Sequence, residues 1–211
     1  DAQESRGLGD VYKRQLPLPP GSDIRVILGD ARTVADAAFP NEKTSPVQSS
    51  PSPGLDDAVS YRTAIDTDWV EACFTVVDLW DAAVIRHRVA SQEFYRRVAA
   101  RSAAAGVVAV NLLDGHPFEY SRRQAATLST VFDHVAVVLD TEPEDAEGPL
   151  GNVVIFASDA PLDKVTASVL LDTPRPHLLL DGALTSWIAE ARIMTDADGT
   201  DSPDPDDPLW G

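Results

Sequence analysis

Residues 74–82 read FTVVDLWDA, and this stretch decides the fold class that we predict. The run is rich in β-forming residues and apolar through Val77, as expected of a strand that is covered on both faces. Asp78 and Asp81 follow where the strand gives way to a loop. In α/β proteins the carboxyl ends of such strands are where ligands bind. The stretch therefore predicts both a fold class and a place for the site.

Similar apolar runs recur on both sides of this stretch, and helical patterns separate them. We predict further strands at residues 24–28, 106–113, 134–139 and 152–157. We predict helices at residues 33–39, 91–105, 122–131, 162–171 and 183–191. Strands that alternate with helices indicate an α/β fold with a mainly parallel sheet covered by helices.

The composition limits the classes of partner. The 211 residues include 34 Asp and Glu against 17 Lys and Arg, and the formal net charge is −17. Such a surface repels phosphate backbones and anionic lipids, so we expect neither nucleic acid nor a membrane as partner. A cationic amine would be attracted, although acidity that serves solubility is the simpler explanation. The single cysteine, Cys73, has no ligand cluster around it, so we predict no metal site and a reducing, cytoplasmic location.

The two ends of the chain differ from its middle. Residues 5–15 read SRGLGDVYKRQ, the translation of a transposase-type sequencing adapter, so we expect residues 1–15 not to belong to the protein. The GLGD in that segment does not follow a buried strand, as a nucleotide-binding loop would. We expect one partial domain over residues 16–193 with a Ser/Pro-rich insertion at 40–57, and an acidic disordered tail over 194–211.

Three strand ends are possible places for a site, at residues 29–31, 78–81 and 111–116, and the first two carry the candidate site residues. After the first strand, Gly29 and Ala31 would let an aromatic base approach the carboxylate of Asp30, and an ordinary Gly-Asp turn is the alternative. After the second strand, Asp78 and Asp81 could hold a cationic amine and take its proton. For Asp81 the alternative is that it caps the next helix.

The order of these features resembles the spermidine synthase-like, or polyamine aminopropyltransferase, family. The resemblance rests on IRVILGDAR, FTVVDLWDA, SQEFYRRVAARSAAAGVVAVNLL and GNVVIFASD. It implies a Rossmann-like class I methyltransferase fold, with Gly29, Asp30 and Ala31 at the nucleoside and Asp30 on its adenine amine. By the same resemblance Asp78 contacts the co-substrate and also positions and deprotonates the attacking amine. Asp81 then helps to bind that amine.

The resemblance also implies a reaction, which is aminopropyl transfer from decarboxylated S-adenosylmethionine to a polyamine such as putrescine. No cofactor would be tightly bound, because this compound or S-adenosylmethionine itself is a co-substrate. In the family the first strands and the glycine-rich loop precede the Gly-Asp strand. Here the adapter-like residues occupy that position, so we expect the fold to be truncated and this fragment to be inactive as written.

Two departures from the family keep other functions open. The family's Tyr-containing polyamine loop is missing, and Arg86 and Arg88 would repel a diamine. One alternative is an S-adenosylmethionine-dependent methyltransferase with another acceptor. The other is a non-catalytic nucleoside-binding or interaction domain. As partner we expect a small-molecule amine substrate, and a homodimer is one possible assembly.

Overall fold

The computed structural model describes residues 29–37, 69–145, 148–171 and 174–205. The predicted strand at 24–28, the insertion at 40–57 and residues 1–15 lie outside them. The described helices and strands are, in chain order, α2 (Ala31–Asp36), β1 (Ala72–Val77), η1 (His87–Val89), α4 (Gln92–Ala100), β2 (Ser102–Asp114), α5 (Glu119–Leu128), β3 (His134–Leu139), β4 (Gly151–Ser158), α6 (Asp163–Val169), β5 (His177–Leu179) and α7 (Asp181–Ile188).

Five strands form one sheet in the order β1-β2-β4-β3-β5. β1 and β2 are parallel, whereas the other three neighbouring pairs are antiparallel. The prediction of a mainly parallel sheet is therefore wrong for this part of the chain. The cause is the connection between β3 and β4, whose described residues contain turns and no helix. Without a crossover helix the chain reverses, and the two strands pair as a hairpin.

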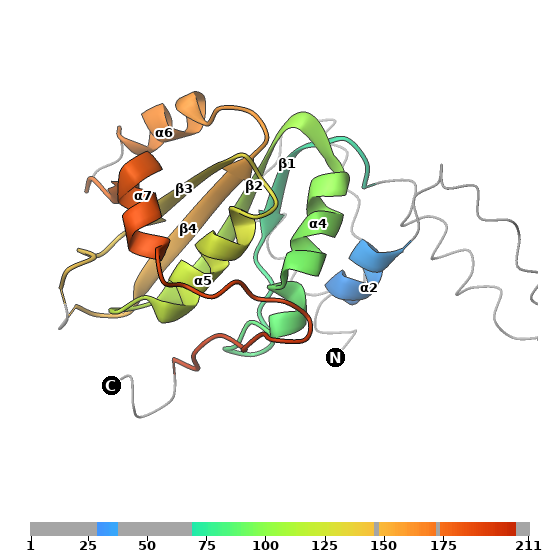
Figure 1. Cartoon of the computed structure of the whole chain (residues 1–211), viewed down its shortest axis with the longest axis horizontal. Helices are drawn as coiled ribbons and strands as arrows, with labels where there is room; N and C mark the ends of the chain where they lie inside the picture. The colour runs from blue at the N-terminus through green and yellow to red at the C-terminus, as the bar shows by residue number, and fades with distance from the viewer. Residues whose placement is uncertain (1–28, 38–68, 146–147, 172–173, 206–211) are drawn as a thin grey trace, which may run out of the picture.

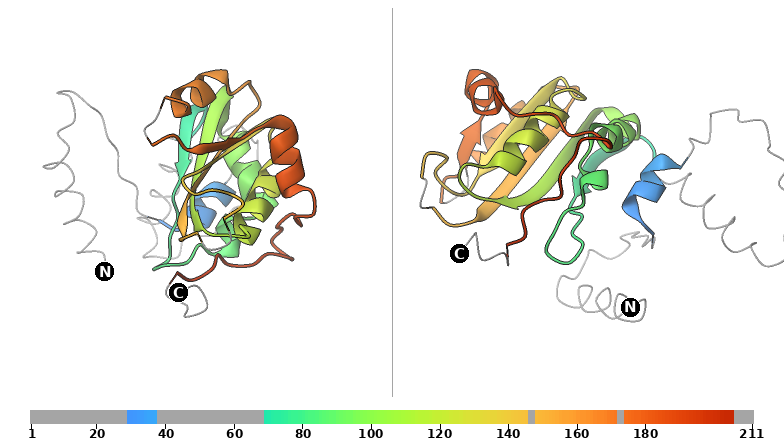
Figure 2. Two further views of the ribbon diagram at one scale, coloured as in Figure 1. Left: turned by 90° about the vertical axis from the view of Figure 1, so that its left-hand side faces the viewer. Right: turned by 60° about the horizontal axis from the view of Figure 1, so that its bottom comes forward.

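The two faces of the sheet are covered to different degrees. Helices α4, α5 and α7 lie on one face (Figures 1 and 2). Side chains alternate between the faces, so Val153, Ile155 and Ala157 of β4 point to one face, where all three are fully buried. On β1, Phe74 and Val76 point to the other face and are 58% and 60% exposed.

The start of β2 differs from the sequence-based prediction. The predicted helix at 91–105 ends at Ala100, and the alanines at 103–105 belong to β2 instead. Alanine favours helix, but the pairing of Ala72 with Ser102 takes this segment into the sheet at a bulge. The start of α4 agrees well with the prediction, because Ser91 Oγ accepts a hydrogen bond from the Phe94 N–H at 3.2 Å and caps the helix.

Residues 192–205, which we call the C-terminal strap, run from the end of α7 past α5 and α4 (Figure 1). Met194 is fully buried, and its backbone N–H donates to Thr127 Oγ1 at 2.8 Å. Further along, the Ser202 N–H donates to the carbonyl of Ile85 at 2.9 Å. The expected disordered acidic tail is thus corrected for residues 194–205, because an apolar anchor and ordered hydrogen bonds hold them on the domain. Residues 206–211 lie outside the described residues.

Candidate functional site

Asp78 lies directly after β1, and two neutral donors hold its carboxylate. Trp80 Nε1 donates to Asp78 Oδ1 at 2.7 Å, and Asn111 Nδ2 donates to the same oxygen at 3.1 Å. Val76 lies beside Ala109 in the β1–β2 register, so Asp78 and Asn111 continue the same ladder. The side chain is exposed, and an exposed carboxylate can still accept strong hydrogen bonds from a cationic ligand.

Asp81 lies three residues further on, in a tight turn. Its N–H donates to the carbonyl of Val84 at 2.8 Å, and the Val84 N–H donates back at 3.2 Å. Its Oδ2 accepts a hydrogen bond from Arg86 Nε at 2.7 Å. The helix-capping alternative for Asp81 is wrong, because η1 and α4 have Arg86 and Ser91 at their N-caps. Asp81 is instead the partner of a cation.

Residues 86–88 connect this loop to the C-terminal strap. Arg86 Nη1 donates to Asp201 Oδ2 at 3.0 Å, and the His87 N–H donates to Asp201 Oδ1 at 2.8 Å. Burial alone would raise the pKa of Asp201, but the hydrogen bonds from His87 and Arg86 outweigh it and lower that pKa. The hydrogen bond to Asp81 raises the pKa of Arg86, with Asp201 second. Arg86 is thus held between a carboxylate of the loop and a carboxylate of the strap.

Asp30 is the N-cap of α2, with Gly29 before it and Ala31 as the first helical residue. Its Oδ1 accepts hydrogen bonds from the Thr33 N–H and hydroxyl, both at 2.8 Å, and Arg88 Nη2 lies 3.4 Å from the same oxygen. The hydrogen bonds from Thr33, followed by the nearby arginine charge, lower the pKa of Asp30. The geometry agrees with the local-turn interpretation, and the contact with adenine stays a prediction.

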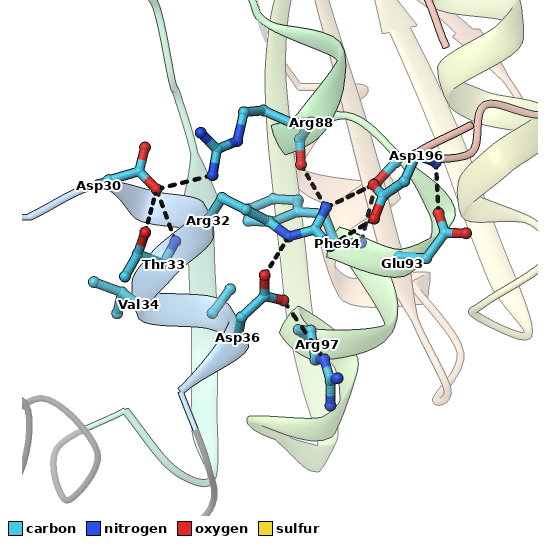
Figure 3. A network of polar contacts seen from close by, with 12 residues as sticks. Asp30, Arg32, Thr33, Val34, Asp36, Arg88, Glu93, Phe94, Arg97 and Asp196 are labelled. Carbon is cyan, nitrogen blue, oxygen red and sulfur yellow. Dashed lines mark hydrogen bonds and ion pairs between the residues drawn. The ribbon is translucent and has the colours of Figure 1, made fainter. Parts of the chain in front are cut away.

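Arg32 joins α2 to the C-terminal strap (Figure 3). Its Nη1 and Nη2 donate to Oδ1 and Oδ2 of Asp196, both at 2.7 Å, and its Nε donates to Asp36 at 2.8 Å. Nη1 also reaches the carbonyl of Arg88 at 2.9 Å. The bidentate ion pair holds α2, and with it the turn at Asp30, against the C-terminal strap, and the hydrogen bond to the Arg88 carbonyl holds it against the loop.

The structure brings the sequence-predicted residues together through contacts that were not predicted. Arg88 pairs with Asp30 and Arg86 with Asp81, so one short segment contacts both predicted strand ends. Asn111 belongs to the third strand end that the sequence indicated, residues 111–116, but no role was assigned to it. Nothing in the sequence indicated that the acidic C-terminal residues return to this loop.

The side chains at this edge are carboxylates, an amide, an indole N–H and guanidinium groups. Such a set can bind a cation and accept its proton. Within the described ranges, no three His, Cys, Asp or Glu side chains are grouped so as to hold a metal ion. No helix of the same ranges is long and apolar enough to cross a membrane.

Comparison with known proteins gives a likeness at the level of the fold. No family model matches the chain, and no curated protein matches it. The crystal structure of a probable spermidine synthase from Corynebacterium glutamicum has a TM-score of 0.61 and 19% sequence identity to it. That match covers 90% of this chain and 61% of the other, so this chain spans less than two thirds of its length.

A second spermidine synthase, solved in complex with the transition-state analogue AdoDATO, matches much less of the chain. Its TM-score is 0.28 with 23% identity, over 34% of this chain and 25% of that one, and it carries no structural argument. The first likeness and the five-stranded sheet confirm the predicted α/β, methyltransferase-like fold class. At this identity the comparison establishes the fold alone, so a function has to be inferred from the residues of the site.

Proposed function

We propose that Asp78 binds and deprotonates an amine acceptor, and that the protein transfers to this amine an aminopropyl group from decarboxylated S-adenosylmethionine. The observation that carries the proposal is the carboxylate of Asp78, exposed at the end of β1 and oriented by Trp80 and Asn111. Both donors are neutral, so the negative charge of Asp78 stays available to a cationic substrate. The fold likeness to a probable spermidine synthase supports the choice of group.

The chemistry requires a neutral nitrogen next to a sulfonium. Asp78 accepts one proton from the substrate ammonium, and the freed lone pair attacks the aminopropyl carbon that is bonded to the sulfonium sulfur. The N–C bond forms as the C–S bond breaks, and the electron pair of the broken bond stays on the sulfur of the leaving thioether. The other contribution of the protein is to position the reacting groups. The hydrogen bonds from Trp80 and Asn111 position the carboxylate of Asp78.

A second function is favoured by one observation, the ion pair between Arg86 and Asp81. The guanidinium of Arg86 disfavours binding of a diamine next to Asp81. A site of this kind fits an S-adenosylmethionine-dependent methyltransferase whose acceptor is a different nucleophile. The base and its orientation would be the same in that enzyme. The two functions differ only in the group that the sulfonium donates and in the acceptor.

The proposal is tested first by amine binding, because the chain spans 61% of the solved spermidine synthase chain. We expect the 211-residue chain to bind putrescine saturably in calorimetry, and Asp78→Asn to weaken that binding about tenfold by removing a charge-assisted hydrogen bond. The control is Asp163→Asn at the start of α6, which removes the same charge outside the site and should leave the affinity unchanged.

Product analysis then separates the two functions, and it uses the longer protein because we expect the 211-residue fragment to be inactive. Spermidine and methylthioadenosine from decarboxylated S-adenosylmethionine and putrescine support aminopropyl transfer. A methylated product from S-adenosylmethionine favours the second function instead. If putrescine does not bind, or binds equally well to the Asp78→Asn variant, the assigned role of Asp78 is wrong in both.

A further inference from the structure

We propose that Arg86 occupies the second carboxylate of this site, so that a diamine acceptor gains no advantage over a primary monoamine. The inference rests on the proposed function, because it assumes that Asp78 receives the reacting amine. It concerns the second carboxylate, Asp81, which would be the natural partner for the other end of a diamine. Arg86 already takes that place.

The contacts of Arg86 hold its side chain from two sides. Nε donates to Asp81 Oδ2 at 2.7 Å, and Nη1 donates to Asp201 Oδ2 at 3.0 Å. Asp201 is itself anchored, since its Oδ1 accepts from the His87 N–H at 2.8 Å. The neighbouring Ser202 Oγ accepts from the Ile85 N–H at 2.9 Å. The guanidinium therefore bridges the loop and the strap in one arrangement.

The two site carboxylates thus present different electrostatic partners to a ligand. Asp78 has an indole N–H and an amide as donors, both uncharged, whereas Asp81 has a guanidinium. A first ammonium gains a full ion pair at Asp78. A second ammonium near Asp81 meets a charge that is already neutralised, and would have to displace Arg86 to gain a partner.

The other charged groups of the loop do not replace Asp81. Arg88 lies 3.4 Å from Asp30 and directs its charge to α2, and His87 Nδ1 lies 3.2 Å from Asp201 Oδ1. Arg86 is half exposed and Asp81 more so, so the effect on affinity is of the size that exposed ion pairs have. Discrimination by this residue should be a few-fold preference and not an absolute block.

The experiment compares 1,4-diaminobutane with 1-aminobutane as calorimetric probes at about 0.15 M salt, where long-range attraction of the doubly charged probe is screened. For the 211-residue chain we expect affinities within about twofold of each other. In Arg86→Ala, which frees Asp81, the diamine should bind about threefold tighter while the monoamine changes little. Asp201→Asn removes one of the two carboxylates that neutralise Arg86. It should therefore weaken binding of the diamine relative to the monoamine.

Arg97→Ala is the matched control, because it removes one cation and one ion pair, the contact with Asp36 at 3.7 Å that joins α4 to α2. Circular dichroism confirms that each variant is folded. The inference is overturned if the unaltered chain already prefers the diamine by tenfold, or if Arg86→Ala shifts both probes as Arg97→Ala does. Failure of the proposed function looks different, since neither probe would then respond to Asp78→Asn.

Discussion

The two faces of the sheet differ in burial, and the side chains of β1 show this difference within one strand. Val77 points under the helices and is buried, while Phe74 and Val76 point to the open face and remain mostly exposed. Asp78 continues the alternation of Phe74 and Val76, as its hydrogen bond with Asn111 of β2 shows. The covered face therefore supplies the stability of the domain, and the open face carries Asp78 of the candidate site.

The largest expected effect separates two neighbouring leucines of β2. Leu112 is 1% exposed on the covered face, and Leu112→Ala should cost about 3 to 5 kcal/mol in the free energy of unfolding. Leu113 points the other way and is only half-buried, so Leu113→Ala should cost about 1 kcal/mol. Urea unfolding of both variants measures the difference. Equal losses would mean that the faces do not differ as described.

A smaller effect is expected at the C-terminal strap, which packs against α4 and α5. Met194 is fully buried beneath it, and Gln124 Nε2 lies 2.9 Å from its sulfur. Met194→Ala should cost about 2 kcal/mol, at the low end for core methionines because a peripheral segment can relax around the cavity. Ile193→Ala, next to it and 39% exposed, is the control and should cost less than about 1 kcal/mol. The same urea titrations test the pair.

The smallest effect concerns pH. The hydrogen bonds from Arg32 lower the pKa of Asp196, so its contribution to stability is present above the unfolded value near 4 and is lost as pH falls through the folded pKa. Asp196 is 41% exposed, so this contribution should be below about 1 kcal/mol. We expect the unfolding free energies of the unaltered chain and Asp196→Asn to converge between about pH 5 and pH 2. A constant gap over that range would contradict the assignment.

Much of the sheet could be predicted from apolar runs. The strand at 134–139 has the predicted bounds, and β4 extends the predicted one by a residue at each end. The direction of the strands was not predicted correctly, because the apolar pattern of a buried strand is the same in parallel and antiparallel pairs. The short connection after β3 was the available signal, since it has little room for a crossover helix.

The sequence singled out the carboxylates Asp78 and Asp81, whose roles stay predictions, but it did not indicate which carboxylates the arginines contact. Asp78 and Asp81 stand out in the sequence because they follow an apolar run at the end of a predicted strand. The pairing of Arg32 with Asp196 and of Arg86 with Asp201 spans 164 and 115 residues. Contacts of that range come from the packing of the whole domain, and no local pattern of charge encodes them. The acidic composition of the last residues instead favoured disorder.

The C-terminal strap also sets an order of events during synthesis. The sheet strands and α4 and α5 leave the ribosome before residues 192–205 do, and domains begin to form as the chain emerges. Until then Arg86 has Asp81 as partner without Asp201, and Arg32 lacks Asp196. The loop that carries Arg86 and the helix that carries Arg32 therefore acquire their final charge balance only after residues 192–205 have been synthesised. A nascent chain stopped before the strap would have the fold but not the finished site.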